Sequence, residues 1–114
     1  MKNLKISIVG LGYVGLPLLV EFSKKYQVIG FDIDKLRISE LQRGYDKTLE
    51  LTSDDLNNLS NLVFTNSVSD IQNCDIYIIT VPTPIDENKK PDLRPLIDAS
   101  RIAGRFIKKD DIVI

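Results

Sequence analysis

The sequence predicts a doubly wound α/β domain with one parallel sheet of strand order 3-2-1-4-5, truncated after the fifth strand. Three observations support this fold class. Short apolar, β-branched runs alternate with amphipathic stretches, the connections between them are short, and a Gly-x-Gly-x-x-Gly turn at 10–15 joins the first run to the first helix. Since 114 residues suffice for one small domain, we expect a single domain over residues 1–114.

The first half of the chain contains two strands, each followed by a helix. Residues 5–9 form a mostly apolar run that predicts a buried strand. The apolar side chains that recur at helical spacing after the glycines predict the first helix; they are Val14, Leu18, Leu19 and Phe22. Residues 27–31 predict a second strand, and Asp34 is placed to cap a second helix that ends near Arg43, before Gly44.

The second half continues the alternation and reaches a fifth strand. Its longest apolar run, at 75–81, is uninterrupted, as expected of a strand that is covered on both faces. The other predicted elements are a short helix after the capping box at 52–55, a strand at 62–65, a helical turn at 67–72, a polar loop at 85–91, a helix with the apolar face Leu93, Leu96, Ala99, Ala103 and Phe106, and a strand that begins at Asp111. Together these elements describe a Rossmann-like sheet.

Composition excludes several classes of function. The 15 basic and 16 acidic residues nearly cancel and form no basic stripe, so we expect no nucleic-acid partner. There is no secretory signal and no apolar run long enough to span a membrane, and we expect a cytoplasmic protein without a membrane partner. The single cysteine, Cys74, and the absence of histidine argue against a disulfide framework and against a zinc site.

The glycine turn at 10–15 predicts a dinucleotide site. Gly10 permits the tight turn, Gly12 lets a pyrophosphate approach the backbone, and Gly15 allows close packing of the helix. Asp32 lies 22 residues after Gly10, at the end of the second predicted strand, where a carboxylate accepts hydrogen bonds from the adenosine ribose. FAD or S-adenosylmethionine remain alternatives, as does a plain βα turn in which Asp32 only caps a helix.

Two further features refine the choice of cofactor. The Asp32 carboxylate would repel a 2′-phosphate, which favours NAD over NADP. Arg37 either stacks on the adenine or forms a salt bridge outward, and it leaves room for some tolerance of NADP. Thr83, in the Val-Pro-Thr-Pro segment at 81–84, follows the fourth strand and offers a hydroxyl at the ligand edge. The alternative for that segment is a rigid exit turn without ligand contacts.

Four segments carry a resemblance to a known family. They are Val-Gly-Leu-Gly-Tyr-Val-Gly-Leu-Pro-Leu at 9–18, Gly-Phe-Asp-Ile-Asp at 30–34, Val-Pro-Thr-Pro-Ile-Asp at 81–86 and Pro-Asp-Leu at 91–93. The chain resembles the N-terminal NAD-binding domain of the UDP-glucose/GDP-mannose dehydrogenase family along its whole length. Within the family it is most similar to the UDP-N-acetylhexosamine 6-dehydrogenases of bacterial polysaccharide synthesis, including the Vi-antigen type.

The resemblance implies that the parent enzyme oxidises the C6 hydroxymethyl of a UDP-sugar to the uronic acid, and that it is a homodimer. The family's catalytic cysteine, lysine and asparagine lie downstream, so we expect no catalytic residue here, an inactive fragment, and a longer parent protein. Cys74 precedes the fourth strand and is not expected to be the nucleophile. The implied cofactor contacts are Gly10, Gly12, Tyr13, Val14, Gly15, Asp32, Arg37 and Thr83, with Tyr13 and Val14 acting mainly through backbone N–H groups.

Two other functions stay open at this point. The chain could be a stand-alone NAD-binding or NAD-sensing module without chemistry. It could also belong to an NAD-dependent dehydrogenase of another substrate class, such as a hydroxyacid dehydrogenase, although the Pro-Thr-Pro stretch at 82–84 resembles the nucleotide-sugar enzymes instead.

Overall fold

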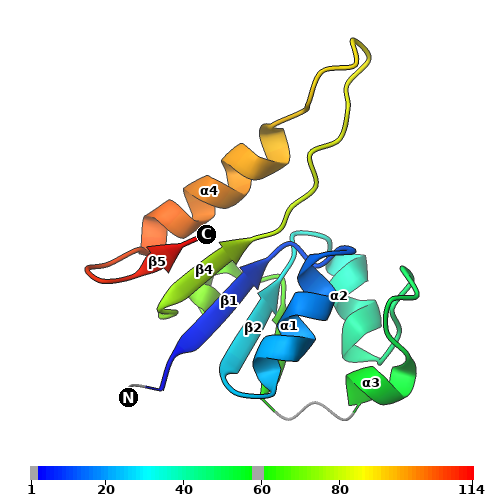
Figure 1. Ribbon diagram of the computed structural model, residues 1–114, viewed down its shortest axis with the longest axis vertical. Helices are drawn as coiled ribbons and strands as arrows, with labels where there is room; N and C mark the ends of the chain where they lie inside the picture. The colour runs from blue at the N-terminus through cyan, green and yellow to red at the C-terminus, as the bar shows by residue number, and fades with distance from the viewer. Residues whose placement is uncertain (1–2, 58–60) are drawn as a thin grey trace.

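A parallel sheet of five strands forms the centre of the chain in a computed structural model, which describes residues 3–57 and 61–114 (Figure 1). The strand order is β3-β2-β1-β4-β5, which confirms the predicted topology. The elements are β1 (Lys5–Val9), α1 (Gly15–Ser23), β2 (Gln27–Phe31), α2 (Lys35–Gln42), α3 (Ser53–Asn57), β3 (Leu62–Thr65), a 3₁₀ helix η1 (Val68–Ile71), β4 (Ile76–Ile79), α4 (Arg94–Phe106) and β5 (Ile112–Val113).

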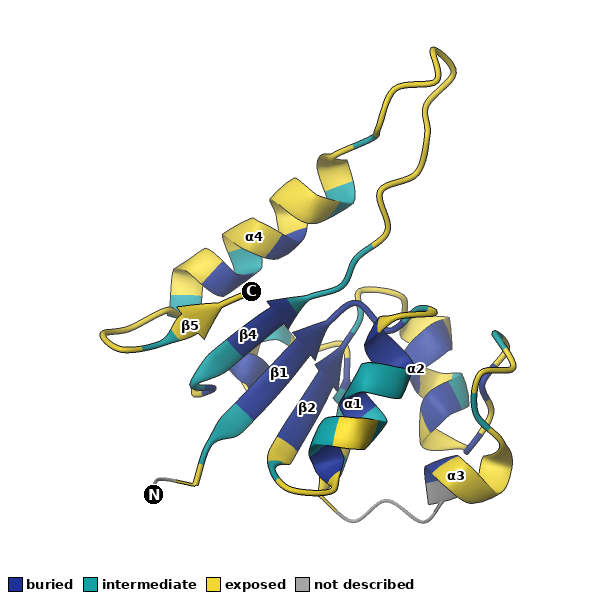
Figure 2. Cartoon of the chain, in the orientation of Figure 1, coloured by how far each residue is buried: buried dark blue, intermediate teal, exposed yellow. Residues whose placement is uncertain are grey.

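The sheet separates two hydrophobic cores because successive side chains of a strand point to opposite faces. Ile6 and Ile8 of β1 pack with α1, α2 and α3 on one face. Val9 packs with η1 and α4 on the other face, where the Tyr77 hydroxyl donates to the carbonyl oxygen of Ile71 at 2.9 Å. Much of β1, β2 and β4 is coloured as buried in Figure 2, as expected of a parallel sheet that is covered on both faces.

The first helix begins later than the apolar spacing predicts. α1 starts at Gly15, and Val14 precedes it as the N-cap residue with 66% of its surface exposed. The buried face of α1 is formed by Leu16 and Leu19, and Val14 does not contribute to it. The prediction for Val14 is wrong because the glycine turn carries this residue past the edge of the sheet, where no core exists.

The predicted helix caps are confirmed. The Asp34 carboxylate accepts hydrogen bonds from the backbone N–H groups of Leu36 and Arg37, and Gly44 follows α2 with a φ of 82°. The capping box also forms, because Thr52 and Asp55 exchange hydrogen bonds of 3.0 and 3.2 Å between side chain and backbone. These caps fix where the chain enters α2 and α3.

The last helix is only partly packed. Ala99 and Ala103 of α4 are buried, whereas Leu96 and the preceding Leu93 are 38% and 48% exposed, against the predicted apolar face. The amino end of α4 extends beyond the sheet toward a protruding arm formed by the polar loop at 85–91 (Figure 1), so the sheet does not reach those two leucines.

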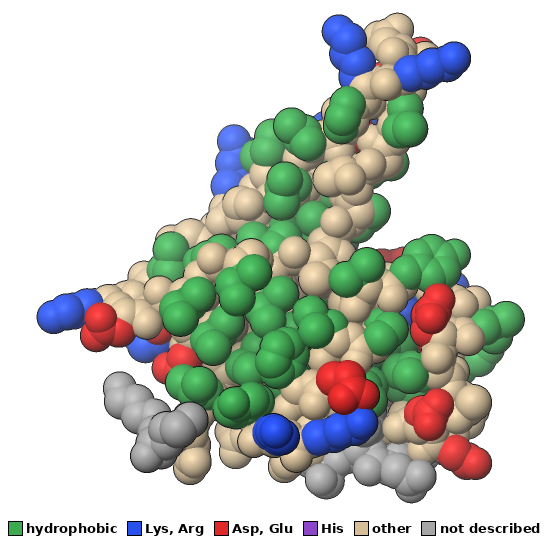
Figure 3. All heavy atoms as spheres, viewed as in Figure 1, with side chains coloured by type: hydrophobic (Ala, Val, Ile, Leu, Met, Phe, Trp, Pro, Cys, Tyr) green, Lys and Arg blue, Asp and Glu red, His purple; other side chains and the backbone are tan. Residues whose placement is uncertain are grey.

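Apolar side chains gather on the face of the molecule over β4 and β5 (Figure 3). Ile112 and Ile114, at the end of the chain, are 52% and 69% exposed. β5 forms its ladder with β4. Within the described residues, no helix is long and apolar enough to cross a membrane.

Candidate cofactor site

The glycine turn is held rigidly at the carboxyl edge of the sheet. Gly10 has a φ of 103°, a conformation that disfavours side chains, and its N–H donates to the carbonyl oxygen of Phe31 at 2.8 Å. The Thr80 hydroxyl donates to the Gly10 carbonyl oxygen at 2.7 Å. A Cβ atom at Gly15 would collide with that same carbonyl oxygen and lie 2.5 Å from the Thr80 hydroxyl. Gly15 is therefore needed chiefly by the turn itself.

The amino end of α1 is open toward a ligand. Its N-cap residue, Val14, makes no side-chain cap hydrogen bond, in contrast to Asp34 before α2. The first N–H groups of a helix carry partial positive charge and favour phosphate when no side chain satisfies them. A Cβ atom at Gly12 would meet no other atom within 4 Å, so the space beside this backbone is free. These are the features that a pyrophosphate needs.

Asp32 supports the turn and keeps acceptor capacity for a ligand. One carboxylate oxygen accepts from the Leu11 N–H at 2.9 Å, and the other accepts from the Asp34 N–H at 3.0 Å. Each oxygen of an ionised carboxylate accepts about two hydrogen bonds, so one position on each oxygen stays available. Two adjacent ribose hydroxyls match this pair of acceptors.

Arg37 lies inside the protein and not on its surface. Only 3% of the residue is exposed, and its Nη1 donates to the Asp46 carboxylate at 2.8 Å. Its Nε donates to the carbonyl oxygen of Leu11 at 2.8 Å. Of the two alternatives that the sequence left open, the outward salt bridge is wrong, because Arg37 pairs with a carboxylate that is itself buried in the loop after α2. Stacking of Arg37 on an adenine stays a prediction.

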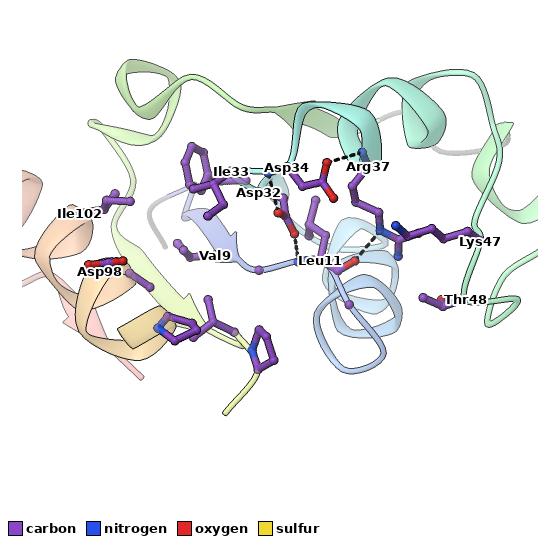
Figure 4. A pocket seen from close by; sticks show the side chains of 17 residues that line it. Val9, Leu11, Asp32, Ile33, Asp34, Arg37, Lys47, Thr48, Asp98 and Ile102 are labelled. Atoms are coloured by element: carbon purple, nitrogen blue, oxygen red, sulfur yellow. Dashed lines mark hydrogen bonds between the residues drawn. The ribbon is translucent and has the colours of Figure 1, made fainter. Parts of the chain in front are cut away.

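A pocket of about 340 Å³ lies between these groups, within the size range of small-ligand sites. Lys47 and Thr48, from the loop after α2, stand on one side, and Asp98 and Ile102, from α4, stand on the other (Figure 4). Its wall is mainly apolar, and Asp32, Asp34 and Arg37 are among the charged residues that line it.

Comparison with known proteins settles the family. The model of the UDP-glucose/GDP-mannose dehydrogenase family, NAD binding domain, matches residues 4–114. The chain belongs to this family. NAD is therefore the cofactor of this domain, as the sequence predicted.

Relatives of the domain are nucleotide-sugar dehydrogenases. It is 57% identical to UDP-N-acetyl-D-glucosamine 6-dehydrogenase of Pseudomonas aeruginosa and 53% identical to that of Salmonella typhi, in both cases over all of this chain. The chain spans 27% of the length of each of these relatives.

Solved structures of the family share the fold. A UDP-D-ManNAc dehydrogenase of Pyrococcus horikoshii matches 96% of this chain and 27% of its own, with 30% identity and a TM-score of 0.90. A ternary complex of GDP-mannose dehydrogenase from Pseudomonas aeruginosa matches 91% of this chain and 25% of its own, with 28% identity and a TM-score of 0.82.

The structure of this family member brings together only some of the predicted contact residues. Gly10, Gly12, Asp32 and Arg37 line the pocket. The predicted contacts that do not line it are Tyr13, Val14, Gly15 and Thr83. Tyr13, like Val14, is largely exposed beside the turn, and Thr83 is exposed on the arm. Their contacts with NAD stay predictions.

Several residues of the NAD-binding domain were missed from the sequence. Thr80 holds the turn, Lys47 and Thr48 line one side of the pocket, and Asp46 pairs with Arg37 behind it. The one local signal for the wall is the pair of Asp46 and Thr48, since an aspartate often accepts from the N–H two residues on, as it does here at 3.0 Å. No motif marks Asp98 as part of the same pocket.

Neither a metal centre nor a reactive thiol is found in the part of the chain that the structure describes. No group of three potential metal ligands occurs among the described residues. Cys74 is fully buried before β4, at the edge of the sheet opposite the glycine turn, and burial raises the pKa of its thiol to about 11. A thiol in this environment is a poor nucleophile.

Proposed function

We propose that this chain is the NAD-binding domain of an NAD-dependent UDP-sugar 6-dehydrogenase, with residues 1–114 as one domain of a longer enzyme. The observation that carries the proposal is the 57% identity, over the whole chain, to UDP-N-acetyl-D-glucosamine 6-dehydrogenase of Pseudomonas aeruginosa. The parent enzyme would oxidise the C6 hydroxymethyl of a UDP-N-acetylhexosamine to a uronic acid for polysaccharide synthesis. The 57% identity to such an enzyme favours this function over that of an NAD sensor or a hydroxyacid dehydrogenase.

The residues present fit NAD. The open backbone at Gly12 and the uncapped amino end of α1 would hold the pyrophosphate, and the Asp32 carboxylate would hold the adenosine ribose. The adenine would lie between α4 and the loop after α2. NAD, when bound, supplies the oxidant of the reaction.

The proposal places the chemical step outside this chain. Cys74 lies away from the pocket, and we assign no catalytic residue to this chain. The proposal therefore places aldehyde capture and substrate choice in the part of the parent enzyme outside residues 1–114. It includes a cytoplasmic homodimer without membrane or nucleic-acid partners, which gel filtration of the full-length enzyme and cell fractionation would test.

Calorimetric titration with NAD and NADP tests the cofactor site. We expect saturable NAD binding, and much weaker NADP binding because the 2′-phosphate would face Asp32. Asp32→Asn keeps an oxygen acceptor for the Leu11 N–H, removes the charge and replaces the other oxygen with an amide nitrogen, which donates. It should weaken NAD binding by about tenfold, the loss of one charge-assisted hydrogen bond.

Asp54→Asn is the matched control, because it removes a carboxylate from the exposed surface of α3. It should leave NAD affinity unchanged. Equal affinities of the wild type for NAD and NADP, or equal effects of the two substitutions, would contradict the assignment of Asp32. For the full-length enzyme, NADH formation that does not depend on a UDP-N-acetylhexosamine would contradict the proposed substrate class.

A further inference from the structure

Asp46 is a buried carboxylate that lies outside the glycine turn. It binds Arg37 and the loop after α2, and residues of that loop line one side of the cofactor pocket. One of its oxygens accepts from Arg37 and from both the N–H and the hydroxyl of Thr48, at 2.6 to 3.0 Å. The other accepts from the N–H groups of Glu50 and Leu51 at 3.0 and 3.1 Å. Its side chain is 0% exposed, so the carboxylate is bound by groups of the protein and is not solvated by bulk water.

Arg37 is held between this carboxylate and the glycine turn. Its Nη1 is bound to Asp46 and its Nε to the Leu11 carbonyl oxygen, at 2.8 Å each. Its Nη2 is buried and has no hydrogen-bond partner among residues 3–57 and 61–114, and the residue lines the pocket beside Asp32. The guanidinium is thus positioned at the adenosine corner, but two contacts prevent it from turning toward a ligand.

We propose that Asp46 is a positioning and specificity residue, which holds Arg37 against the glycine turn. The Arg37 guanidinium then cannot reach a phosphate on the ribose 2′ oxygen, and this strengthens the preference for NAD over NADP. This inference rests on the proposed NAD site. Arg37 is the residue through which Asp46 acts.

The balance of charge at the corner of the pocket around Arg37 supports this role. The carboxylates of Asp32 and Asp34 line the same corner as Arg37 and Lys47, and Asp46 lies directly behind Arg37. Three carboxylates against two cations leave this corner negative, which opposes a 2′-phosphate of charge about −1.5 to −2. Without the Asp46 charge the corner would be neutral, and Arg37 would lose the partner that fixes its rotamer.

The test compares dissociation constants for NAD and NADP across matched variants of this chain, measured by calorimetry. Asp46→Asn keeps the shape of the side chain but removes the charge, and it replaces one of the two accepting oxygens with an amide nitrogen, which donates. We expect the ratio of the NADP constant to the NAD constant to fall by about tenfold, the effect of one nearby unit charge. The double variant Asp46→Asn/Arg37→Met should return the ratio toward the wild-type value.

Glu50→Gln is the control, since it removes an exposed carboxylate from the same loop without touching the pocket. It should leave the ratio unchanged. An unchanged ratio in folded Asp46→Asn, or an equal change in Glu50→Gln, would overturn the inference. Lack of NAD binding by the wild type would instead overturn the proposed function, so the two failures are distinguishable.

Arg37→Met provides a second route if Asp46→Asn does not fold. Asp46 would keep the hydrogen bonds from Thr48, Glu50 and Leu51 in this variant, so the loop should persist. The inference expects discrimination against NADP to hold or increase, because the negative charge remains while the cation is gone. A fall in discrimination would show that Arg37 excludes NADP by itself and would refute the role of Asp46.

Discussion

Removing Asp46 should destabilise the domain more than removing Arg37. The two side chains are 0% and 4% exposed, so solvent screens their interaction little. Asp46→Ala would leave the Arg37 guanidinium buried with only the Leu11 carbonyl oxygen as a partner. Breaking a buried ion pair in this way costs about 3–5 kcal/mol, a large part of the 5–15 kcal/mol that stabilises a typical domain.

Arg37→Met should cost less, because four hydrogen bonds from Thr48, Glu50 and Leu51 continue to satisfy the Asp46 carboxylate. We expect about 1–3 kcal/mol, the loss of a charged hydrogen bond with limited desolvation. The exposed pair of Glu21 and Lys24, with side chains 69% and 62% exposed, supplies the control, and Glu21→Ala should change stability by at most about 1 kcal/mol.

Urea unfolding followed by circular dichroism measures these differences. The order of destabilisation should be Asp46→Ala, then Arg37→Met, then Glu21→Ala. If Asp46→Ala cost no more than Arg37→Met, Asp46 would not anchor the loop. If it cost no more than Glu21→Ala, the buried pair would contribute nothing beyond a surface ion pair, and the reasoning from burial would be refuted.

Three further expectations follow from the same structure. Burial acts to raise the pKa of Asp46, but the hydrogen bonds from Thr48 and Arg37 outweigh it and hold the pKa below 3.8. The group therefore stabilises the fold above pH 3.8 and loses this contribution as the pH falls through its folded pKa; acid unfolding of Asp46→Asn should show a smaller pH dependence there. Iodoacetamide should label Cys74 at pH 8 only after urea is added, since the folded thiol is buried with a pKa of about 11; rapid labelling without urea would contradict this. The exposed apolar residues of the edge strand β5 should let this chain self-associate, and Ile112→Lys should reduce the association measured by light scattering, because a charge there discourages edge pairing. Unchanged scattering would contradict this role of β5.

The sequence alone determined the sheet and the ligand edge. The strands at 5–9, 27–31 and 62–65 lie at their predicted bounds, since runs of β-branched residues bounded by turns are local signals. The position of Asp32 beside the glycine turn was also predictable, because two strands joined by one helix pair in parallel and end at the same edge of the sheet. The loop at 85–91 and the caps of α2 and α3 depend on the same short-range chemistry.

Only the tertiary structure decided which carboxylate pairs with Arg37 and which residues line the pocket opposite the glycine turn. A buried arginine must find a partner, but spacing in sequence does not say which carboxylate supplies it, and the loop after α2 folds Asp46 under Arg37. The pocket wall likewise joins Thr48 to Asp98 of α4, two residues that the chain separates widely. Helical periodicity marked Leu93 and Leu96 as core, yet the sheet ends before it can cover them. Such pairings depend on packing between distant segments, which no local pattern encodes.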